Sequence, residues 1–415
     1  MNILHINNTD ISGGRFNGYY MKKSLDKSFN VEMVVWNKES HNSNVYQSPP
    51  DYPLLRFFAL NFDRVCVRLG FDGLTGLIGW ILPFQDYFKR ADIVHIHQIH
   101  NHPNFSILSL PMLTKKKPII WTIHDPWAIT GGCEHSFECN RWLNGCKSPC
   151  PHPRRKSLFR KYTPSVHWKI KKMVYKRSNL NLVVASKWMK DRIERSPLLR
   201  HLPCHHIPFG IDLDVFKPRS KADCRKKLGI PMEHKVIAFR DIEHSPNMSS
   251  YKGIKYLMEA LKMYNPTEPT TLLIFENGKG FKILSPKYNV LTPGWINGED
   301  LVIALSAADI FLMPSVQEAF GLMAVESMAC GTPVIVFEGT ALPDVINAPH
   351  CGLAVPSKNS RALAEAIKQL LENDEFRCRL GRQARHTAER EYSFTQYVQR
   401  HISLYEKVIK QHNRY

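Results

Sequence analysis

The chain has 415 residues, of which 43% are hydrophobic, and it carries a formal net charge of +19. This length exceeds what one hydrophobic core usually supports and predicts two domains of roughly 200 residues each. No secretory signal is apparent, and the nearest approach to a membrane span, Leu74 to Leu82, is too short to cross a bilayer. We therefore expect a cytoplasmic protein whose ten cysteines are mostly reduced.

The positive charge is concentrated in residues 147–177, which contain eleven Lys or Arg and no Asp or Glu. Such a block attracts anionic surfaces. Upstream, Leu54–Leu60 and Val65–Phe84 supply apolar and aromatic side chains, some at helical spacing. Two interpretations stay open. The segments form a peripheral interface with the anionic inner face of a membrane, or they are ordinary core beside a solvated basic face. Nucleic-acid binding is not expected, because no recognised motif accompanies the block.

Apolar runs alternate with helical patterns through the first half of the chain, as in parallel β-α-β units. The predicted strands are Asn2–Asn7, Val31–Trp36, Ile93–His97, Pro118–Ile123, Leu180–Ala185 and Cys204–Pro208. A loop with Gly13 and Gly14 follows the first strand, and a helix begins near Asn17. Paired glycines let backbone N–H groups approach a phosphate or an acceptor closely, although a simple turn explains them equally well.

The second half repeats the pattern after a linker at Ile207–Pro218, which is rich in Pro and Gly. The predicted strands are Val236–Arg240, Thr271–Glu276, Asn289–Thr292, Ile310–Met313 and Pro333–Phe337. Residues from Ser393 to Ile409 have the spacing of a helix. The whole chain is therefore predicted to be α/β.

Two carboxylates bracket the segment Glu318-Ala-Phe-Gly-Leu-Met-Ala-Val-Glu326, where a predicted strand gives way to a helix. Unpaired N–H groups at such a helix start favour a phosphate. An ionised Glu in the loop accepts two strong hydrogen bonds and suits sugar hydroxyls. Taken alone, the same spacing also fits a surface Glu pair beside a buried helix.

Four cysteines, Cys133, Cys139, Cys146 and Cys150, lie within 18 residues. Closely spaced thiolates in a reducing compartment suggest a structural zinc site, with His135 as a competing ligand. Reduced cysteines in a tight loop and disulfides are the alternatives.

The Glu318–Glu326 segment and its continuation Gly331-Thr-Pro-Val-Ile335 resemble the donor-site motif of family 4 glycosyltransferases, retaining enzymes with the GT-B fold. Ala319 stands where relatives often have Pro. The resemblance spans nearly the whole chain and is strongest over residues 118–151 and 290–357. The four-cysteine segment is similar to one in glycosyltransferases of colanic-acid and other exopolysaccharide synthesis.

The resemblance implies two Rossmann-like domains that face each other across a cleft. Residues 1–208 would form the acceptor-side domain and residues 209–392 the donor-binding domain, with a helix at about 393–415 packing back on the first. In Trp121-Thr-Ile-His-Asp125, His124 is similar to the family's cleft histidine, although a lone His at a strand end is more often structural. Asp125 would orient it or cap the next segment.

The remaining site residues come from the donor domain. The resemblance assigns the donor diphosphate to Arg240, Lys252 and the N–H groups near Phe320, Gly321 and Leu322. It assigns hydroxyls of the transferred sugar to Glu318 and the ribose to Glu326. Fixed cations and helix N–H groups suit a leaving diphosphate, which accumulates negative charge. Without the resemblance, both cations could be ordinary solvated side chains.

The function implied is retaining transfer of a hexose from a UDP- or GDP-sugar to a lipid-linked or oligosaccharide acceptor. The setting implied is bacterial surface polysaccharide: exopolysaccharide, O-antigen, lipopolysaccharide or capsule. The metal site of the other major glycosyltransferase fold is not evident, so no divalent ion is expected to be required for catalysis. The rival hypotheses are a phosphorylase or sugar-phosphate synthase, and a catalytically silent sugar-nucleotide-binding or basic adaptor protein.

Overall fold

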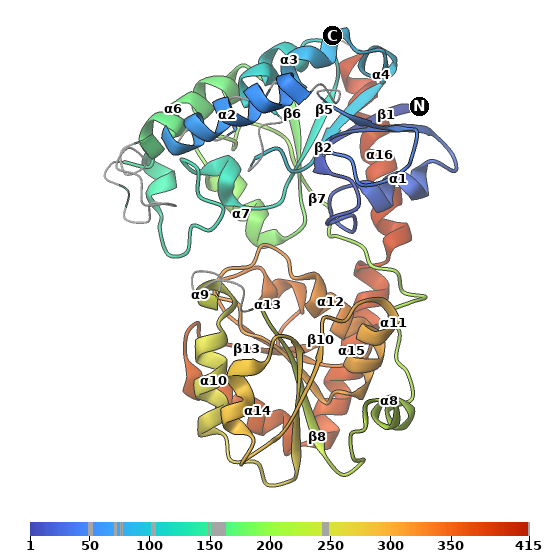
Figure 1. Ribbon diagram of the computed structural model, residues 1–415, viewed down its shortest axis with the longest axis vertical. Helices are drawn as coiled ribbons and strands as arrows, with labels where there is room; N and C mark the ends of the chain where they lie inside the picture. The colour runs from blue at the N-terminus through green and yellow to red at the C-terminus, as the bar shows by residue number, and fades with distance from the viewer. Residues whose placement is uncertain are drawn as a thin grey trace. The chain divides into compact units, whose positions relative to one another are not determined.

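The computed structural model describes residues 1–48, 53–69, 73–74, 76, 78–100, 105–147, 150, 163–242 and 249–413. Part of the basic block, residues 148–149 and 151–162, therefore lies outside the described residues, as do residues 243–248. The chain forms two compact units (Figure 1). The first, called the N-terminal unit, comprises Met1–Ile207 and Val398–Tyr415. The second comprises Pro208–Tyr397, and we call it the donor unit after the role expected from the sequence.

The N-terminal unit is built on a seven-stranded parallel sheet with the strand order β3-β2-β1-β4-β5-β6-β7. The strands are β1 (Asn2–Thr9), β2 (Asn30–Asn37), β3 (Val45–Gln47), β4 (Ile93–Ile96), β5 (Ile119–Ile123), β6 (Leu180–Val184) and β7 (Cys204–His206). Its helices are α1 (Tyr19–Leu25), α2 (Pro53–Leu69), α3 (Ile78–Ile81), α4 (Asp86–Arg90), α5 (Leu110–Leu113), α6 (Thr163–Lys176), α7 (Lys187–Arg195) and most of α16 (Phe394–His412). The central strands are buried along their length, as expected for a parallel sheet covered on both faces.

The donor unit repeats this design with six parallel strands in the order β10-β9-β8-β11-β12-β13. The strands are β8 (Lys235–Asp241), β9 (Thr270–Glu276), β10 (Asn289–Gly294), β11 (Ile310–Met313), β12 (Val334–Phe337) and β13 (Gly352–Val355). The helices are α8 (Lys221–Leu228), α9 (Ser249–Lys252), α10 (Ile254–Met263), α11 (Gly298–Ala307), α12 (Leu322–Ala329), α13 (Leu342–Val345), α14 (Ser360–Leu371) and α15 (Asp374–Glu391). The predicted α/β class is confirmed.

Every strand predicted from the sequence is present, with boundaries that differ by a residue or two. Two strands were missed, β3 and β13. Both are short and lie at an edge of their sheet, where a strand has one neighbour and needs only a weak apolar pattern. None of the helices in the described part of the chain is long and apolar enough to span a membrane.

A buried carboxylate aligns the two strands that carry much of the donor unit's candidate site. Asp309, just before β11, is 4% exposed and accepts a hydrogen bond of 2.7 Å from the backbone N–H of Val236 in β8. The Arg225 guanidinium and the Lys221 ammonium each lie 2.8 Å from it. Burial would raise the pKa of Asp309, but these cations hold it below its usual value. Removing either partner would strand a buried charge.

Strand order reverses direction once in each sheet, between β1 and β4 in the N-terminal unit and between β8 and β11 in the donor unit. In open α/β sheets, ligands bind beyond the carboxyl ends of the strands at such a reversal. The loops that follow β1, β4 and β5, and those that follow β8, β9 and β11, are therefore the places to examine.

Candidate active site

An ion pair joins two loops of the donor unit. The Lys252 ammonium at the end of α9 lies 2.7 Å from a carboxylate oxygen of Glu318, in the loop between β11 and α12. Both side chains are about one-fifth exposed. Burial by itself would lower the pKa of Lys252, but the Glu318 carboxylate raises it above its ordinary value. Lys252 is therefore held as a cation that a ligand can still reach.

A second cation lies at the carboxyl end of β8. The Arg240 guanidinium is 2.6 Å from the carboxylate of Glu276, the last residue of β9, and stacks 4.2 Å from the ring centre of Trp295. It also donates to the sulfur of Met323, in the first turn of α12, at 3.6 Å. The charge of Arg240 acts on the pKa of Lys252. The structure thus brings Arg240, Lys252, Glu318 and the start of α12 together.

Two glycines make this assembly possible. Gly253, after Lys252, has φ +74°, and a β-carbon there would lie 1.8 Å from the carbonyl oxygen of Pro314. Gly321, before α12, has φ +96°, and its β-carbon would lie 2.4 Å from the Leu342 side chain. Both positions combine a left-handed backbone with a close approach, so only glycine fits. A hydrogen bond of 2.8 Å from Val316 N–H to the carbonyl of Tyr251 ties the same two loops together.

The other predicted donor residues lie deeper. The Phe320 side chain is 5% exposed and packs edge-on against Phe209 and Tyr392, so only its backbone could serve a ligand. Leu322 begins α12, where the first N–H groups of a helix have no partner within the helix. Glu326, one turn on, is completely buried. The predicted ribose contact of Glu326 is untested by this arrangement.

Sequence reasoning missed two members of this group, Glu276 and Trp295. Glu276 ends a strand that was predicted correctly, so the strand-end rule could have found it. Trp295 follows β10 and is 62% exposed; a large exposed ring beside a cation was not evident from spacing alone.

In the N-terminal unit, the loop after β1 is a compact, heavily bonded turn. The Asn17 side chain donates to the carbonyls of Asp10 and Ser12, each at 2.9 Å. Gly13 has φ +73°, and a β-carbon there would lie 2.9 Å from the ring of Phe16. A β-carbon on Gly14 would lie 3.0 Å from the carbonyl of Ile11. Turn geometry thus requires Gly13, and a ligand role for the pair stays a prediction.

His124 follows β5 and lies against the ring of Phe16, with 5.9 Å between ring centres. Burial lowers its pKa to about 4, more than the Asp125 charge raises it. The imidazole is therefore neutral at pH 7. Asp125 caps the turn that follows by accepting from Trp127 N–H at 2.7 Å, and its other oxygen lies 2.9 Å from His100. Of the two roles expected of Asp125, the capping role is confirmed.

Three further histidines, which sequence reasoning did not single out, lie in the core beneath this edge. They are His5 in β1, His95 in β4 and His97 just after β4. One ring nitrogen from each lies within 4.8 Å of one ring nitrogen of each of the other two. His5 Nδ1 and His97 Nε2 are 2.9 Å apart, a contact in which one ring donates and the other accepts. His95 is held on both sides, by Tyr405 and by Thr122, each at 2.7 Å. The trio is a bonded core network in which both nitrogens of His95 and one nitrogen each of His5 and His97 are engaged. Among the described residues, His5 Nε2 and His97 Nδ1 are buried without a hydrogen-bond partner.

Burial keeps this trio neutral. It lowers the pKa of His5 to about 3, and it lowers the pKa values of His95 and His97 well below the ordinary value. The mutual proximity of the three rings acts in the same direction.

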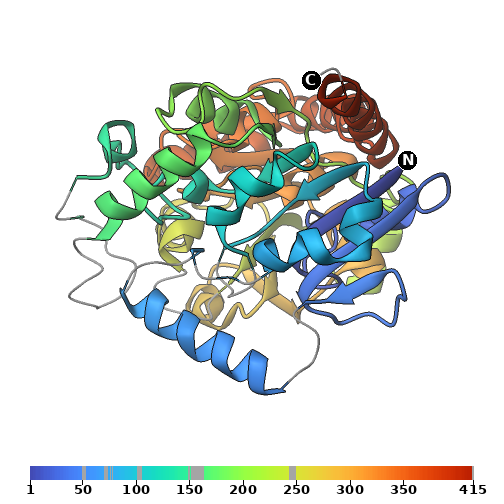
Figure 2. The ribbon, with the colours of Figure 1, turned by 90° about the horizontal axis from the view of Figure 1, so that it is seen from above.

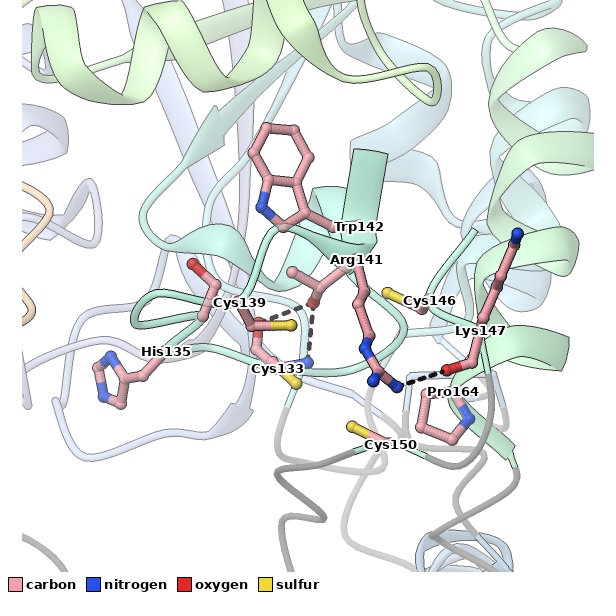
Figure 3. Close-up of a pocket in the computed structure, with 11 residues that line it drawn as sticks. Cys133, His135, Cys139, Arg141, Trp142, Cys146, Lys147, Cys150 and Pro164 are labelled. Carbon is pink, nitrogen blue, oxygen red and sulfur yellow. Dashed lines mark hydrogen bonds between the residues drawn. The ribbon is translucent and has the colours of Figure 1, made fainter. Parts of the chain in front are cut away.

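The four clustered cysteines line one cavity (Figure 3). All ten cysteines of the chain are free thiols. One member of the basic block lies in this region and is not at the surface: Lys171 in α6 is fully buried and donates to the carbonyls of Trp127 and Thr130. Lys171 is therefore not part of a solvated basic face, because two backbone carbonyls and the Trp127 ring, 3.4 Å away, hold its ammonium inside.

Two parallel six- or seven-stranded Rossmann-like sheets in one chain, each with candidate residues at its strand reversal, define the GT-B fold of glycosyltransferases. Sucrose-phosphate synthase from Thermosynechococcus elongatus has the same fold, with a TM-score of 0.68 and 18% identity over 99% of both chains. The Anabaena protein HepE, solved in complex with UDP, matches with a TM-score of 0.65 and 14% identity, over 98% of this chain and all of that one.

Family models point the same way. Residues 40–215 match the model described as Glycosyltransferase Family 4, and residues 220–387 match Glycosyl transferases group 1. A D-inositol 3-phosphate glycosyltransferase from Saccharomonospora viridis is 30% identical over 200 residues, which are 44% of this chain and 45% of that one. The chain thus matches about half the length of this curated relative.

Proposed function

We propose that this protein is a retaining glycosyltransferase that moves a hexose from a nucleotide-sugar donor to a lipid-linked or oligosaccharide acceptor. The observation that carries the proposal is the gathering of Arg240, Lys252 and Glu318 at the start of α12. Two cations and a helix start suit a departing diphosphate, and a carboxylate beside them suits sugar hydroxyls. The matches to two glycosyltransferase family models support the same class.

In this proposal each cation exchanges partners when the donor arrives. Lys252 leaves Glu318 for the diphosphate, and Glu318 then accepts hydrogen bonds from hydroxyls of the transferred sugar. As the bond from the sugar to the diphosphate breaks, the negative charge that develops on the diphosphate is stabilised by Lys252, Arg240 and the N–H groups at Gly321 and Leu322. Fixed charges that need no rearrangement at that moment lower the barrier most.

Retention of configuration would follow from attack on the same face of the sugar as the leaving phosphate. That phosphate would accept the proton of the acceptor hydroxyl, so no protein nucleophile is needed. We assign His124 a supporting role as a neutral imidazole that hydrogen-bonds a sugar hydroxyl, which its lowered pKa suits. No divalent cation enters this scheme.

The donor class proposed is a UDP- or GDP-hexose. The Anabaena relative was solved with UDP and with UDP-glucose, which favours UDP among the two. The acceptor proposed is an intermediate of a surface polysaccharide such as an exopolysaccharide, O-antigen or capsule.

An exposed apolar stripe on α2 supports an acceptor that resides in a membrane. Leu54, Phe58, Phe62, Val65 and Leu69 recur at helical spacing and are between 38% and 74% exposed. Figure 2 shows α2 set apart from the other helices of its unit. The exposed Arg64 and Arg68 on the same helix would attract anionic lipid headgroups. The interpretation of this stretch as core holds only further along, where Ile78 and Leu82 are buried.

The membrane part of the proposal is tested by sedimentation with vesicles of phosphatidylglycerol and of phosphatidylcholine. We expect binding to the anionic vesicles only, and loss of that binding in Phe58→Ser/Phe62→Ser. Ile283→Ser is the matched control, because Ile283 is 69% exposed but belongs to the donor unit. Equal binding by all variants would remove α2 from the proposal.

The transfer itself is tested by release of UDP or GDP from a panel of nucleotide sugars. We expect slow release from one donor, abolished by Glu318→Ala and retained by Glu338→Ala, which removes an exposed carboxylate from the same unit. Donor binding is measured on the same samples. Binding without release from any donor, with extracted lipid acceptors present, would favour the silent sugar-nucleotide-binding protein. An absence of binding would overturn the proposal.

A further inference from the structure

Residues between Thr130 and Lys147, together with Cys150 and Pro164, line a cavity of about 20 Å³. This is room for one water-sized particle. All four clustered cysteines line it, although they are separated by five, six and three residues in the sequence. Figure 3 shows their four sulfur atoms arranged around a common space, with Cys139 and Cys146 pointing toward each other across it. The ring of His135 points away from that space.

We propose that Cys133, Cys139, Cys146 and Cys150 bind one zinc ion as a structural tetrathiolate site. Zinc in structural sites takes four ligands in a tetrahedron, and four thiolates are one of its preferred sets. His135, the competing ligand, is not part of this set, because its ring faces away from the space between the sulfurs (Figure 3). The site has no open position, so it would organise the loop and take no part in the transfer.

The loop backbone is already arranged to present these sulfurs. Cys146 has φ +48°, a left-handed conformation that residues with a β-carbon rarely adopt, and it follows Gly145 at φ +90°. Its sulfur accepts a hydrogen bond of 3.2 Å from the backbone N–H of Gly131. Such N–H contacts to sulfur are typical of the shell around metal-bound thiolates. The Thr130 hydroxyl accepts a hydrogen bond from the N–H of Cys133 and donates one to its carbonyl, each at 2.8 Å.

Charge around the cluster fits a zinc tetrathiolate, whose net charge is negative. Arg141 and Lys147 line the cavity, and the Arg141 guanidinium donates to the carbonyl of Lys147 at 3.3 Å. The buried Lys171 ammonium is held just below by the carbonyl of Thr130, at 3.1 Å. Each of these cations would offset part of that negative charge.

Zinc binding requires the four sulfurs to move closer together. No three of the four sulfurs already lie within 4.8 Å of one another; of the residues described, only the histidine trio meets that spacing. With zinc–sulfur bonds of about 2.3 Å, the sulfurs would lie about 3.8 Å apart. All four cysteines lie in loops, outside helices and strands, and all are partly exposed. Side-chain rotation can therefore draw them inward without unravelling an element.

Two anchors hold the loop while this happens. Trp168 in α6 donates from its indole to the carbonyl of Trp142 at 3.0 Å. On the other side, Arg192 in α7 stacks 5.8 Å from the Trp142 ring and donates to Ser136 Oγ at 3.2 Å. The frame is therefore fixed by α6 and α7, and the four sulfurs are left as the adjustable part.

The test is the zinc content of the full-length protein purified without chelators, measured by plasma mass spectrometry. We expect one zinc per chain, released by a thiol-specific mercurial. Replacement by Co²⁺ should give the intense absorption of a tetrahedral thiolate complex. A zinc-free protein that also fails to bind added Zn²⁺ would overturn the proposal, as would a mass lower by two or four hydrogens, which reports disulfides.

Variants assign the ligands. Cys139→Ser and Cys146→Ser should each lose most of the zinc, whereas Cys378→Ser, which removes an exposed thiol of the donor unit, should keep it. If either cluster variant fails to fold, the cobalt spectrum of the native chain still decides the ligand set. Full zinc content in both cluster variants would contradict the assignment. Because the readout is metal content, its outcome is independent of whether the chain transfers a sugar.

Discussion

The two units use opposite electrostatic strategies at equivalent places in their sheets. At its strand reversal the donor unit holds two charged pairs, Lys252 with Glu318 and Arg240 with Glu276. All of these side chains except Glu276 are about one-fifth to one-quarter exposed. The N-terminal unit instead places histidines there, buried and neutral. A charged pair can exchange its partner for an anionic ligand, whereas a neutral bonded network can only orient. On the proposed function, we expect the charged pairs of the donor unit to bind the donor diphosphate, and the neutral histidines of the N-terminal unit to act through their position alone.

The sharpest way to break this comparison is to remove a donor-unit cation. Lys252→Ala should lower turnover of the donor by about 10²- to 10³-fold, the usual effect of losing one stabiliser of a developing charge. Lys255→Ala, three residues on and exposed, is the matched control and should stay close to the native rate. Steady-state release of nucleotide diphosphate measures both. Similar rates for the two variants would show that Lys252 does not contribute to the transfer reaction.

Acid should destabilise the N-terminal unit more than the donor unit. His5 and His124 have folded pKa values of about 3 and about 4, below the ordinary 6.5. Between these values the unfolded chain binds more protons, so the unfolding free energy falls as pH drops below 6.5. Each such histidine costs up to about 1.4 kcal/mol per pH unit. We expect hydrogen exchange at pH 4.5 to show the N-terminal unit opening first. Simultaneous opening of both units would contradict the comparison.

A glycine at the histidine network gives a smaller and more local effect. Gly18 has φ +90°, and a β-carbon there would lie 2.3 Å from His97 Nε2. Gly18→Ala should lower the unfolding free energy by about 3 kcal/mol, from overpacking and left-handed strain together. Gly229→Ala, at φ +67° with nothing within 4 Å, isolates the strain and should cost about 1 kcal/mol. Denaturant titration with probes specific to each unit measures both unfolding free energies. Equal losses in Gly18→Ala and Gly229→Ala would show that the contact with His97 does not matter.

Replacing Arg240 by Lys keeps the charge and removes the planar group. Arg240 stacks on Trp295 and binds Glu276. An ammonium can still pair with Glu276, but it does not reproduce the planar stacking on Trp295. We expect Arg240→Lys to weaken donor binding by about tenfold. Isothermal titration with the donor identified from the panel measures it, and Arg382→Lys, on the exposed surface of α15, is the control. An unchanged dissociation constant would mean that only the charge of Arg240, and not its planar group, matters for donor binding.

The smallest expected effect is none at all. Brief exposure to EDTA should leave turnover unchanged, because Lys252 and Arg240 supply the positive charge that a divalent ion supplies in other enzymes. An absolute requirement for added Mg²⁺ or Mn²⁺ would show that these two cations are insufficient.

Much of the fold could be predicted because buried parallel strands are continuous apolar runs, as at Ile310–Met313 and Ile119–Ile123. The donor-site residues could be proposed because strand ends and helix starts dictate where charge is useful. The partners of those residues could not be predicted. That Lys252 would contact Glu318, or Arg240 would contact Glu276, depends on loop paths set by Gly253 and Gly321. The histidine network was missed because its three members come from two strands.

The division of the chain sets the order in which the protein can be completed during synthesis. The donor unit is contiguous, whereas the N-terminal unit also needs Val398–Tyr415. Tyr405, from that segment, bonds His95 in the core of the N-terminal unit. Domains usually fold in the order in which the ribosome makes them. Here the N-terminal unit is made first, but the contact of Tyr405 with its histidine core can form only after the donor unit has been synthesised.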